Sequence, residues 1–528
     1  MLARTVSATP WGVDARPVQV EVDIHAGLPQ TQIVGLPDAS VKESRERVRS
    51  AMKNSGFDVP PRVVVINLAP ADLRKEGNHL DLAIALAQLV GLGHLPQECL
   101  DGRLFCGELG LDGAVRPVRG GLAIADLASR EGLKEVILPY QNAPEAAALD
   151  CVPVVPVRSL AEAVEHLTGS KIPPVRHAGL GAVHLASGPD LSEVRGQESA
   201  KRALEVAAAG GHNLLFIGPP GSGKTMLARR LPGILPALSL AESIEVTKIH
   251  SLVAEEPPSH LLAVRPFRSP HPGTSTAGMV GGGTIPRPGE ASLAHGGVLF
   301  LDELPEFRRD TLEALRQPLE EGTVTVVRTR ARFDFPARFA LLAAMNPCPC
   351  GHLGDPRGSC RCAPPLVERY RARVSGPLLD RIDLHVEVPA LTLRELKGPP
   401  SESSARVAER VATARKIQAG RFAAGNPSPI NAALSPEGLR KHCVLAPDAR
   451  RLLDAAFERL GLSARAVTRI LKVARTIADL AGQEHIQASH VAEGIQYRSL
   501  DRRIEPPRRR PEGRVRQQQT KVDPGRRQ

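Results

Sequence analysis

Hydrophobic positions in the first third of the chain alternate between the spacing of strands and that of helices. Residues 16–24 alternate apolar and polar side chains, as a half-buried strand does, and residues 60–70 form an apolar run bounded by prolines. Residues 80–93 have helical spacing and end at a glycine. Expected strands cover 16–24, 60–70, 104–106 and 136–138, and expected helices cover 39–55, 80–93 and 160–167. This pattern predicts a mixed α/β domain.

The middle of the chain repeats this alternation, whereas the last part has helical spacing throughout. A helix at 197–210 leads into an apolar strand at 213–218, and strands follow at 298–301 and 339–346, so a parallel sheet is expected. Expected helices of the last part cover 405–419, 448–460, 464–481 and 488–497. The predicted parts are an α/β domain at 1–168, a linker at 169–190, a second α/β domain at 191–395, a helical domain at 396–500 and a disordered basic tail at 501–528.

Composition and charge narrow the class of protein. The 528 residues are 42% hydrophobic and 24% charged, as in folded multidomain proteins. No apolar run reaches the roughly 18 residues that span a bilayer, and the N-terminus lacks a secretory apolar segment, so we expect a cytoplasmic protein without a membrane partner. The net charge of +11 points to polyanions, but 10 basic and 4 acidic residues lie in the tail at 501–528.

The strongest chemical motif is GPPGSGKT at 218–225, which follows an apolar strand and precedes a helix. Its glycines allow backbone N–H groups to form a nest around phosphates. Lys224 would neutralise phosphate charge, and Thr225 would ligate Mg²⁺. The predicted nucleotide-binding residues are Gly218, Pro219, Pro220, Gly221, Ser222, Gly223, Lys224 and Thr225. The expected cofactors are therefore ATP and Mg²⁺.

Two further strands end in residues that suit ATP hydrolysis. Asp302 ends the strand at 298–301, where it would hold Mg²⁺, and Glu303 could take the proton of the attacking water. Asn346 ends the strand at 339–346, where it could orient that water. Arg381 in LLDRID and Arg465 near the start of a helix each carry a guanidinium that could reach phosphate oxygens.

The order of these motifs resembles that of AAA+ ATPases of the magnesium-chelatase-like branch. Within this branch, four strings resemble the ComM/YifB family: VEVDIHAGLPQTQIVGLPDASVKESRERVRSA, NLAPADLRKEG, RSPHPGTSTAGMVGGGTIPRPGEASLAHGGVLFLDELPEF and MNPCPCG. The resemblance extends from about residue 2 to residue 497 and leaves out the tail.

The resemblance implies an α/β fold with an AAA+ P-loop ATPase core and a helical lid. It also implies a homo-hexameric ring that hydrolyses ATP between subunits and acts as a branch-migration helicase on single-stranded, forked or branched DNA during natural transformation, alongside recombination proteins. In this scheme Lys224, Glu303 and Asn346 are catalytic, with Asn346 as first sensor. Arg381 would be the finger that reaches the neighbouring subunit's ATP, and Arg465 the second sensor.

Two basic segments are the candidates for DNA contact. The segment 265–290, between the phosphate loop and Asp302, has almost no hydrophobic periodicity, which is typical of a functional loop or of a passive surface loop. The segment 322–339 predicts two strands around a basic turn. Candidate DNA-binding residues are Arg265, Arg268, His271, Arg328, Arg330 and Arg332. With only 3% aromatic residues, binding would be directed mainly at phosphates and would weaken with salt.

Four of the eight cysteines lie within fifteen residues, as two CxC pairs: Cys348, Cys350, Cys360 and Cys362. Four thiolates can bind structural Zn²⁺ tetrahedrally, whereas free thiols in a surface loop are the alternative.

The segment 107–139 resembles the proteolytic domain of Lon-type proteases, which has an S5 domain 2-like α/β fold. Lon-type enzymes use a serine nucleophile and a lysine base. The corresponding positions hold His79 and Ala123, so we expect a degenerate domain and no protease activity.

Two alternatives to the DNA motor remain open at this point. One is the motor subunit of a magnesium chelatase, and the other is a non-proteolytic AAA+ remodelling factor. Stimulation of ATP hydrolysis by DNA would distinguish the DNA motor from both.

Overall fold

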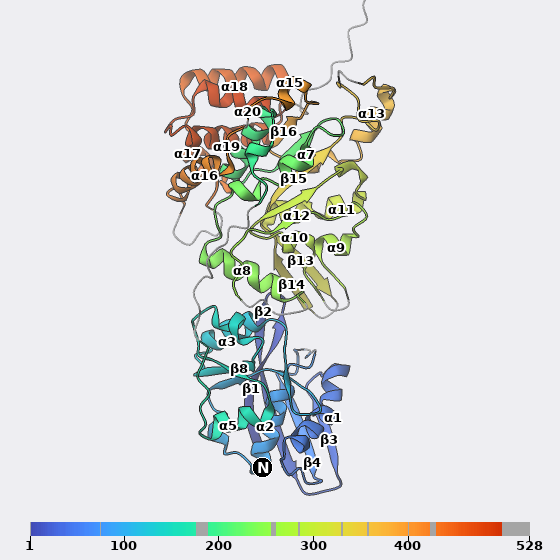
Figure 1. The fold of residues 1–528 in the computed structure, drawn as a ribbon, viewed down its shortest axis with the longest axis vertical. Helices are drawn as coiled ribbons and strands as arrows, with labels where there is room; N and C mark the ends of the chain where they lie inside the picture. The colour runs from blue at the N-terminus through green and yellow to red at the C-terminus, as the bar shows by residue number, and fades with distance from the viewer. Residues whose placement is uncertain are drawn as a thin grey trace, which may run out of the picture.

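The computed structural model describes residues 2–73, 75, 77–175, 188–254, 260–283, 286–328, 331–355, 358–399, 401–422 and 429–498. Most of the predicted linker and the predicted tail lie outside the described residues. Figure 1 shows the N-terminal domain (2–175) at the bottom, the central domain (188–399) above it and the lid (401–498) at the top. No helix in the described part of the chain is long and apolar enough to cross a membrane.

The N-terminal domain is built on a seven-stranded mixed sheet in the order β3-β4-β2-β1-β5-β8-β9. Its strands are β1 (Leu2–Trp11), β2 (Asp14–His25), β3 (Gln30–Val34), β4 (Val63–Ala69), β5 (Arg103–Phe105), β8 (Glu135–Pro139) and β9 (Val154–Val157), with a small hairpin of β6 (Glu108–Leu109) and β7 (Val115–Arg116). Its α-helices are α1 (Ala39–Asn54), α2 (Asp81–Gly91), α3 (Gly121–Arg130), α4 (Ala143–Ala147) and α5 (Leu160–Thr168). Because α2 is apolar on nearly all sides, it is buried along most of its length.

The sequence pattern does not predict β1, although β1 lies near the middle of this sheet. The reason is that hydroxyl side chains occupy several of its buried positions. Thr5, Ser7 and Thr9 are all buried, and the Ser7 hydroxyl donates to the carbonyl oxygen of Phe105 at 2.7 Å. This hydrogen bond offsets the cost of burying the Ser7 hydroxyl, whereas the buried Thr5 hydroxyl has no partner among the described residues.

The central domain contains a five-stranded sheet in the order β11-β12-β15-β10-β16, and every pairing is parallel, as predicted. The strands are β10 (Leu214–Ile217), β11 (Phe267–Arg268), β12 (Val298–Leu301), β15 (Ala340–Met345) and β16 (Leu384–Glu387). A separate hairpin is formed by β13 (Thr323–Arg328) and β14 (Ala331–Pro336). Helices are α6 (Glu198–Gly210), α7 (Lys224–Ala228), α8 (Leu240–Ser251), α9 (Thr276–Val280), α10 (Glu290–Leu293), α11 (Arg309–Ala314), α12 (Arg316–Glu321), α13 (Pro364–Arg371) and α14 (Gly376–Leu379).

The lid is entirely helical in its described part, as predicted. Its helices are α16 (Ser404–Ala419), α17 (Pro436–His442), α18 (Pro447–Leu460), α19 (Ala464–Leu480) and α20 (Ala488–Gln496), and a short α15 (Leu393–Leu396) precedes them. Val411 of α16 and Val473 of α19 belong to the same buried cluster as Phe216 of β10. The lid therefore shares a hydrophobic core with the sheet of the central domain.

The N-terminal domain contacts the central domain at α8 and at the β13–β14 hairpin (Figure 1). The Trp11 ring lies 4.7 Å from the Phe333 ring of the hairpin. The Lys248 ammonium of α8 pairs with Asp126 at 2.7 Å and with Asp14 at 3.5 Å.

Candidate functional site

The 218–225 loop connects β10 to α7 and has the backbone shape of a phosphate-binding nest. Gly221 and Gly223 adopt φ values of +73° and +93°, which side-chain-bearing residues rarely adopt. A Cβ on Gly218 would lie 2.1 Å from the carbonyl oxygen of Val388, so this glycine allows close contact with the segment after β16. The loop conformation therefore requires the glycines that the motif supplies.

Lys224 lies in the hollow of this loop. Its ammonium donates to the carbonyl oxygens of Gly218 at 2.7 Å and Pro219 at 2.9 Å, and to Asn346 Oδ1 at 3.3 Å. Burial lowers the pKa of Lys224, while the charges of Asp302 and Glu303 oppose that shift. The contact with Asn346 joins the phosphate loop to the end of β15.

The end of β12 lies beside the same loop. The Thr225 hydroxyl donates to Asp302 Oδ2 at 2.7 Å, so the two predicted Mg²⁺ ligands are direct neighbours. The backbone N–H of Glu303 donates to the other oxygen of Asp302 at 3.0 Å. Glu303 has a φ of +52°, an uncommon conformation for a residue other than glycine, which is found often at functional sites.

The parallel sheet explains why these residues meet. Because β12, β15 and β10 are adjacent, their carboxyl ends lie at one edge of the sheet, where ligands bind in open α/β folds. Asp302, Asn346 and the phosphate loop directly follow these three strand ends.

Gln197 is a site residue that the sequence analysis misses. It precedes α6 in the left-handed conformation with a φ of +58° and is buried. Its side-chain amide donates to the carbonyl oxygens of Ser222 at 3.2 Å and Pro389 at 2.7 Å, and so fixes the phosphate loop against the segment after β16. No local pattern marks it, because both partners are distant in the chain.

Neither of the two predicted arginines bonds to the phosphate loop among the described residues. Arg381, between α14 and β16, is 6% exposed, donates to the carbonyl oxygen of Pro377 at 2.6 Å and pairs with Glu320. Arg465 lies exposed in the first turn of α19, and none of the described residues bonds to its guanidinium. The finger and sensor roles of these two arginines therefore stay predictions.

Two of the DNA-contact candidates, Arg265 and Arg268, form ion pairs within the chain. Arg265 is largely buried, pairs with Glu242 at 3.1 Å and donates to the carbonyl oxygen of Gly296 at 2.6 Å. Arg268 forms a bidentate pair with Glu290, with both distances 2.7 Å. Because intramolecular acceptors occupy these donors, phosphate contacts of Arg265 and Arg268 would compete with the pairs to Glu242 and Glu290, and these contacts stay predictions. The 265–290 segment also contains β11 and α9, so it is not one continuous loop.

The other DNA-contact candidates are less constrained. His271 is exposed, and its Nδ1 accepts from the backbone of Gly273 at 3.0 Å. Arg332, in the hairpin, has a 68% exposed side chain that pairs with Asp334 at 3.1 Å. The Arg328 side chain and Arg330 lie outside the described residues.

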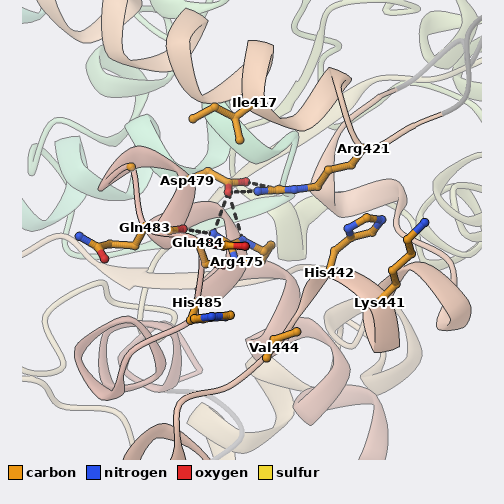
Figure 2. A pocket seen from close by; sticks show the side chains of 11 residues that line it. Ile417, Arg421, Lys441, His442, Val444, Arg475, Asp479, Gln483, Glu484 and His485 are labelled. Carbon is orange, nitrogen blue, oxygen red and sulfur yellow. Dashed lines mark hydrogen bonds and ion pairs between the residues drawn. The ribbon is translucent and has the colours of Figure 1, made fainter.

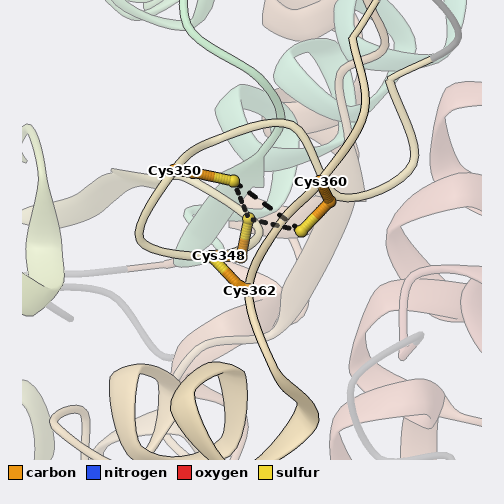
Figure 3. A group of neighbouring side chains, drawn as sticks. All are labelled: Cys348, Cys350, Cys360 and Cys362. Atoms are coloured by element: carbon orange, nitrogen blue, oxygen red, sulfur yellow. Dashed lines mark hydrogen bonds between the residues drawn. The ribbon is translucent and has the colours of Figure 1, made fainter.

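The four clustered cysteines converge in the loop after β15 (Figure 3). Cys348 and Cys350 sulfurs are 3.4 Å apart, each is 3.7 Å from the Cys360 sulfur, and all four sulfurs lie within 4.8 Å of one another. Thiolates around tetrahedral Zn²⁺ lie about 3.8 Å apart, given a Zn–S bond of about 2.3 Å. The donor set therefore fits Zn²⁺.

The cysteine loop also touches the phosphate loop. A Cβ on Gly351, which has a φ of +82°, would lie 2.5 Å from Cδ of Pro220. Arg371 of α13 donates to the carbonyl oxygen of Pro347 at 3.3 Å on the other side. The segment that follows Asn346 is thus held between the 218–225 loop and α13.

A separate hollow of about 380 Å³ lies in the lid beside the end of α19 (Figure 2). Arg421 and Arg475 both pair with the buried Asp479, and Arg475 also donates to the backbone carbonyl oxygens of Gln483 and Glu484. The Asp479 carboxylate compensates the charge of the two guanidinium groups, and the bonds of Arg475 hold the loop after α19 against the helix. None of the predicted site residues lines this hollow.

Comparisons with known proteins agree with this geometry. Three family models match: "Magnesium chelatase, subunit ChlI" at residues 190–396, "Subunit ChlI of Mg-chelatase" at 20–142, and "Magnesium chelatase, subunit ChlI C-terminal" at 401–498. The protein YifB of Escherichia coli is 47% identical over 493 residues, which cover 93% of this chain and 96% of YifB. Competence protein ComM of Haemophilus influenzae is 45% identical over 510 residues, which cover 96% of this chain and 99% of ComM. The chain therefore belongs to the ComM/YifB family of magnesium-chelatase-like proteins.

Proposed function

We propose that this protein is an ATP-hydrolysing DNA motor that works as a homo-hexameric ring in the cytoplasm and drives branch migration during natural transformation. The meeting of the phosphate loop with Asp302 and Asn346 supports the ATPase. The similarity to a protein named for competence supports the role in transformation.

The chemistry would divide among residues of three strand ends. The loop N–H groups and Lys224 would bind the phosphates, and Thr225 and Asp302 would hold the Mg²⁺ that neutralises phosphate charge. Glu303 would accept the proton of the attacking water, and Asn346 would orient that water. Arg381 would act from the neighbouring subunit, and Arg465 would contact the nucleotide from the lid of its own subunit. The Thr225–Asp302 hydrogen bond at 2.7 Å is the observation that carries this proposal.

We also propose that the N-terminal domain is Lon-like but does not cleave peptides. His79, at the position of the expected serine, is buried, and burial lowers its pKa to about 4. Ala123, at the position of the expected lysine, is buried among apolar neighbours. Assembly, DNA engagement or partner binding would then be the role of this domain.

A four-way-junction migration assay with ATP tests the proposed motor. Lys224→Ala should lower ATP hydrolysis at least about 100-fold by removing a phosphate partner, and Glu303→Gln should do the same by removing the general base. Wild-type protein should convert the junction to products only with ATP. Lys416→Ala and Glu409→Gln, at exposed positions of α16, are matched controls that should retain activity.

Two outcomes would contradict this proposal. Wild-type rates in Lys224→Ala or Glu303→Gln would show that these residues do not form the hydrolytic site. If no DNA stimulates ATP hydrolysis and the junctions stay unchanged, the proposal of a DNA motor is wrong. That result would favour a chelatase motor subunit, whose name the family models carry.

A further inference from the structure

An ion pair to a buried acid joins the lid to the segment that carries Arg381. Arg469 of α19 pairs with Asp383, which lies directly before β16 and is 3% exposed. The second oxygen of Asp383 accepts from the backbone N–H of Asn213 at 3.0 Å and lies 3.5 Å from His212 Nδ1. Burial alone would raise the pKa of Asp383, but Arg469 and His212 outweigh burial and hold that pKa far below its ordinary value.

Asn213, whose backbone N–H donates to Asp383, also holds the backbone of Arg381. The Asn213 side-chain amide donates to the carbonyl oxygen of Arg381 at 2.9 Å, and its oxygen accepts from the backbone of Leu341 in β15 at 2.9 Å. Asn213 therefore connects the strand that leads to Asn346 with the segment from Arg381 to Asp383. The Arg381 guanidinium is held by Pro377 and Glu320 on the other side.

At its lid end, this connection starts at Arg469, one helical turn after Arg465, the proposed second sensor. Arg465 and Arg469 are four residues apart on α19, so both lie on one face of the same helix. A rotation of the lid that moves Arg465 would also move Arg469. Because separating a buried ion pair leaves a charge uncompensated, Asp383 would follow Arg469.

We propose that Arg469 and Asp383 are positioning residues that set the placement of Arg381, and so couple the lid of one subunit to ATP hydrolysis in the neighbouring subunit. The proposal rests on the proposed action of Arg381 in trans. It adds a route by which the nucleotide state of one subunit, read by its own lid, reaches the next subunit of the ring.

Mixing of variants tests the proposal. Arg469→Gln alone should lower the rate of ATP hydrolysis at least about tenfold, yet its affinity for a fluorescent ATP analogue should stay within about twofold of wild type, because its own phosphate loop is intact. Lys224→Ala subunits lack a working site but carry an intact Arg381 segment. In a 1:1 mixture, about one interface in four combines a working site with an intact finger, so about a quarter of the wild-type rate should return.

The reference mixture is Arg381→Ala with Lys224→Ala, which tests the finger itself. If this mixture recovers activity and the Arg469→Gln mixture does not, the positioning role is wrong while the finger stands. If neither recovers, the action of Arg381 in trans is wrong, and the positioning role falls with it. Arg469→Lys, which keeps the charge, should restore part of the rate.

A matched control separates positioning from general damage to the lid. Arg421→Gln breaks a comparable ion pair with the buried Asp479, which belongs to the lid alone. It should leave the rate within about twofold of wild type. A loss equal to that of Arg469→Gln would show that any disturbance of the lid has the same effect, and would overturn the proposal.

Discussion

Lys224 shows how single residues depend on their surroundings in this site. Its ammonium bonds to two carbonyl oxygens of its own loop and to Asn346, and burial lowers its pKa. These bonds satisfy a buried charge that would otherwise be costly. The same principle applies to Asp383, whose charge is compensated by Arg469. The buried histidines His79 and His385 behave differently, because burial outweighs their nearby acids and favours the neutral form.

His385 on β16 makes stability sensitive to acid. Burial and the nearby charge of Arg498 lower its pKa from 6.5 to about 3. As the pH falls below about 6.5, the unfolded chain takes up this proton and the folded chain does not, so acid favours unfolding. Between pH 7.5 and pH 5.5 the expected loss is about 1 kcal/mol of unfolding free energy from this residue.

Urea denaturation of wild type and His385→Gln at both pH values measures this effect. The variant should lose about 1 kcal/mol less on acidification than wild type does. His79→Gln should act in the same direction, because burial lowers the pKa of His79 to about 4. Equal losses in wild type and His385→Gln would show that His385 is not buried in its neutral form.

At the scale of elements, the loop after β15 contains residues of two candidate sites. Asn346 faces the phosphate loop, and Cys348 begins the four-cysteine cluster two residues later. Gly351 packs against Pro220, so ordering of the cysteine loop supports one wall of the phosphate loop. A bound Zn²⁺ would replace the hydrophobic core that a loop this short cannot form.

We expect the purified protein to contain about one zinc ion per chain. Replacing Cys348 and Cys350 together by serine should abolish zinc binding, measured by release to a chromogenic chelator after denaturation. Cys151→Ser, at an exposed cysteine outside the cluster, should retain the zinc. Full zinc content in the double variant would exclude these sulfurs as ligands.

At the scale of the whole molecule, the turn between β1 and β2 links the N-terminal domain to the central domain. The Trp11 ring contacts the Phe333 ring in a tilted arrangement, and Val13 packs against a buried cluster of the central domain. Leu122 and Leu261 share a small apolar cluster across the boundary, and the backbone N–H of Gly120 donates to the Ser251 hydroxyl at 3.2 Å. The β13–β14 hairpin, a DNA-contact candidate, is therefore in direct contact with the N-terminal domain.

Lys248→Ala should loosen this contact. Lys248 pairs with Asp126 and Asp14 and is 14% exposed, so the expected loss is about 1 kcal/mol of docking free energy. The chain contains one tryptophan, so intrinsic fluorescence reports on Trp11 alone. We expect a red-shifted emission in Lys248→Ala and an unchanged spectrum in Lys416→Ala. An unchanged spectrum in Lys248→Ala would show that this ion pair does not hold the turn in place.

Local patterns predict the elements that depend on local order. The strand at 298–301 and the helices of the lid follow from apolar spacing, and the phosphate loop follows from glycines at defined intervals. Gln197 and Asn213 are not predictable in this way, since their hydrogen bonds join segments more than a hundred residues apart. Arg265 is the opposite case, because a basic residue in an aperiodic segment looks available for DNA until Glu242 is found beside it.

The sequence by itself determined the α/β class and the family and predicted the residues of a nucleotide site, because side-chain periodicity and short motifs carry that information. Only the tertiary structure decided which of those residues meet. The parallel sheet brings Lys224, Thr225, Asp302 and Asn346 to one edge, and the lid places Arg469 on Asp383. The physical reason is that burial forces each charge to find a partner, and that partner is set by packing between distant segments.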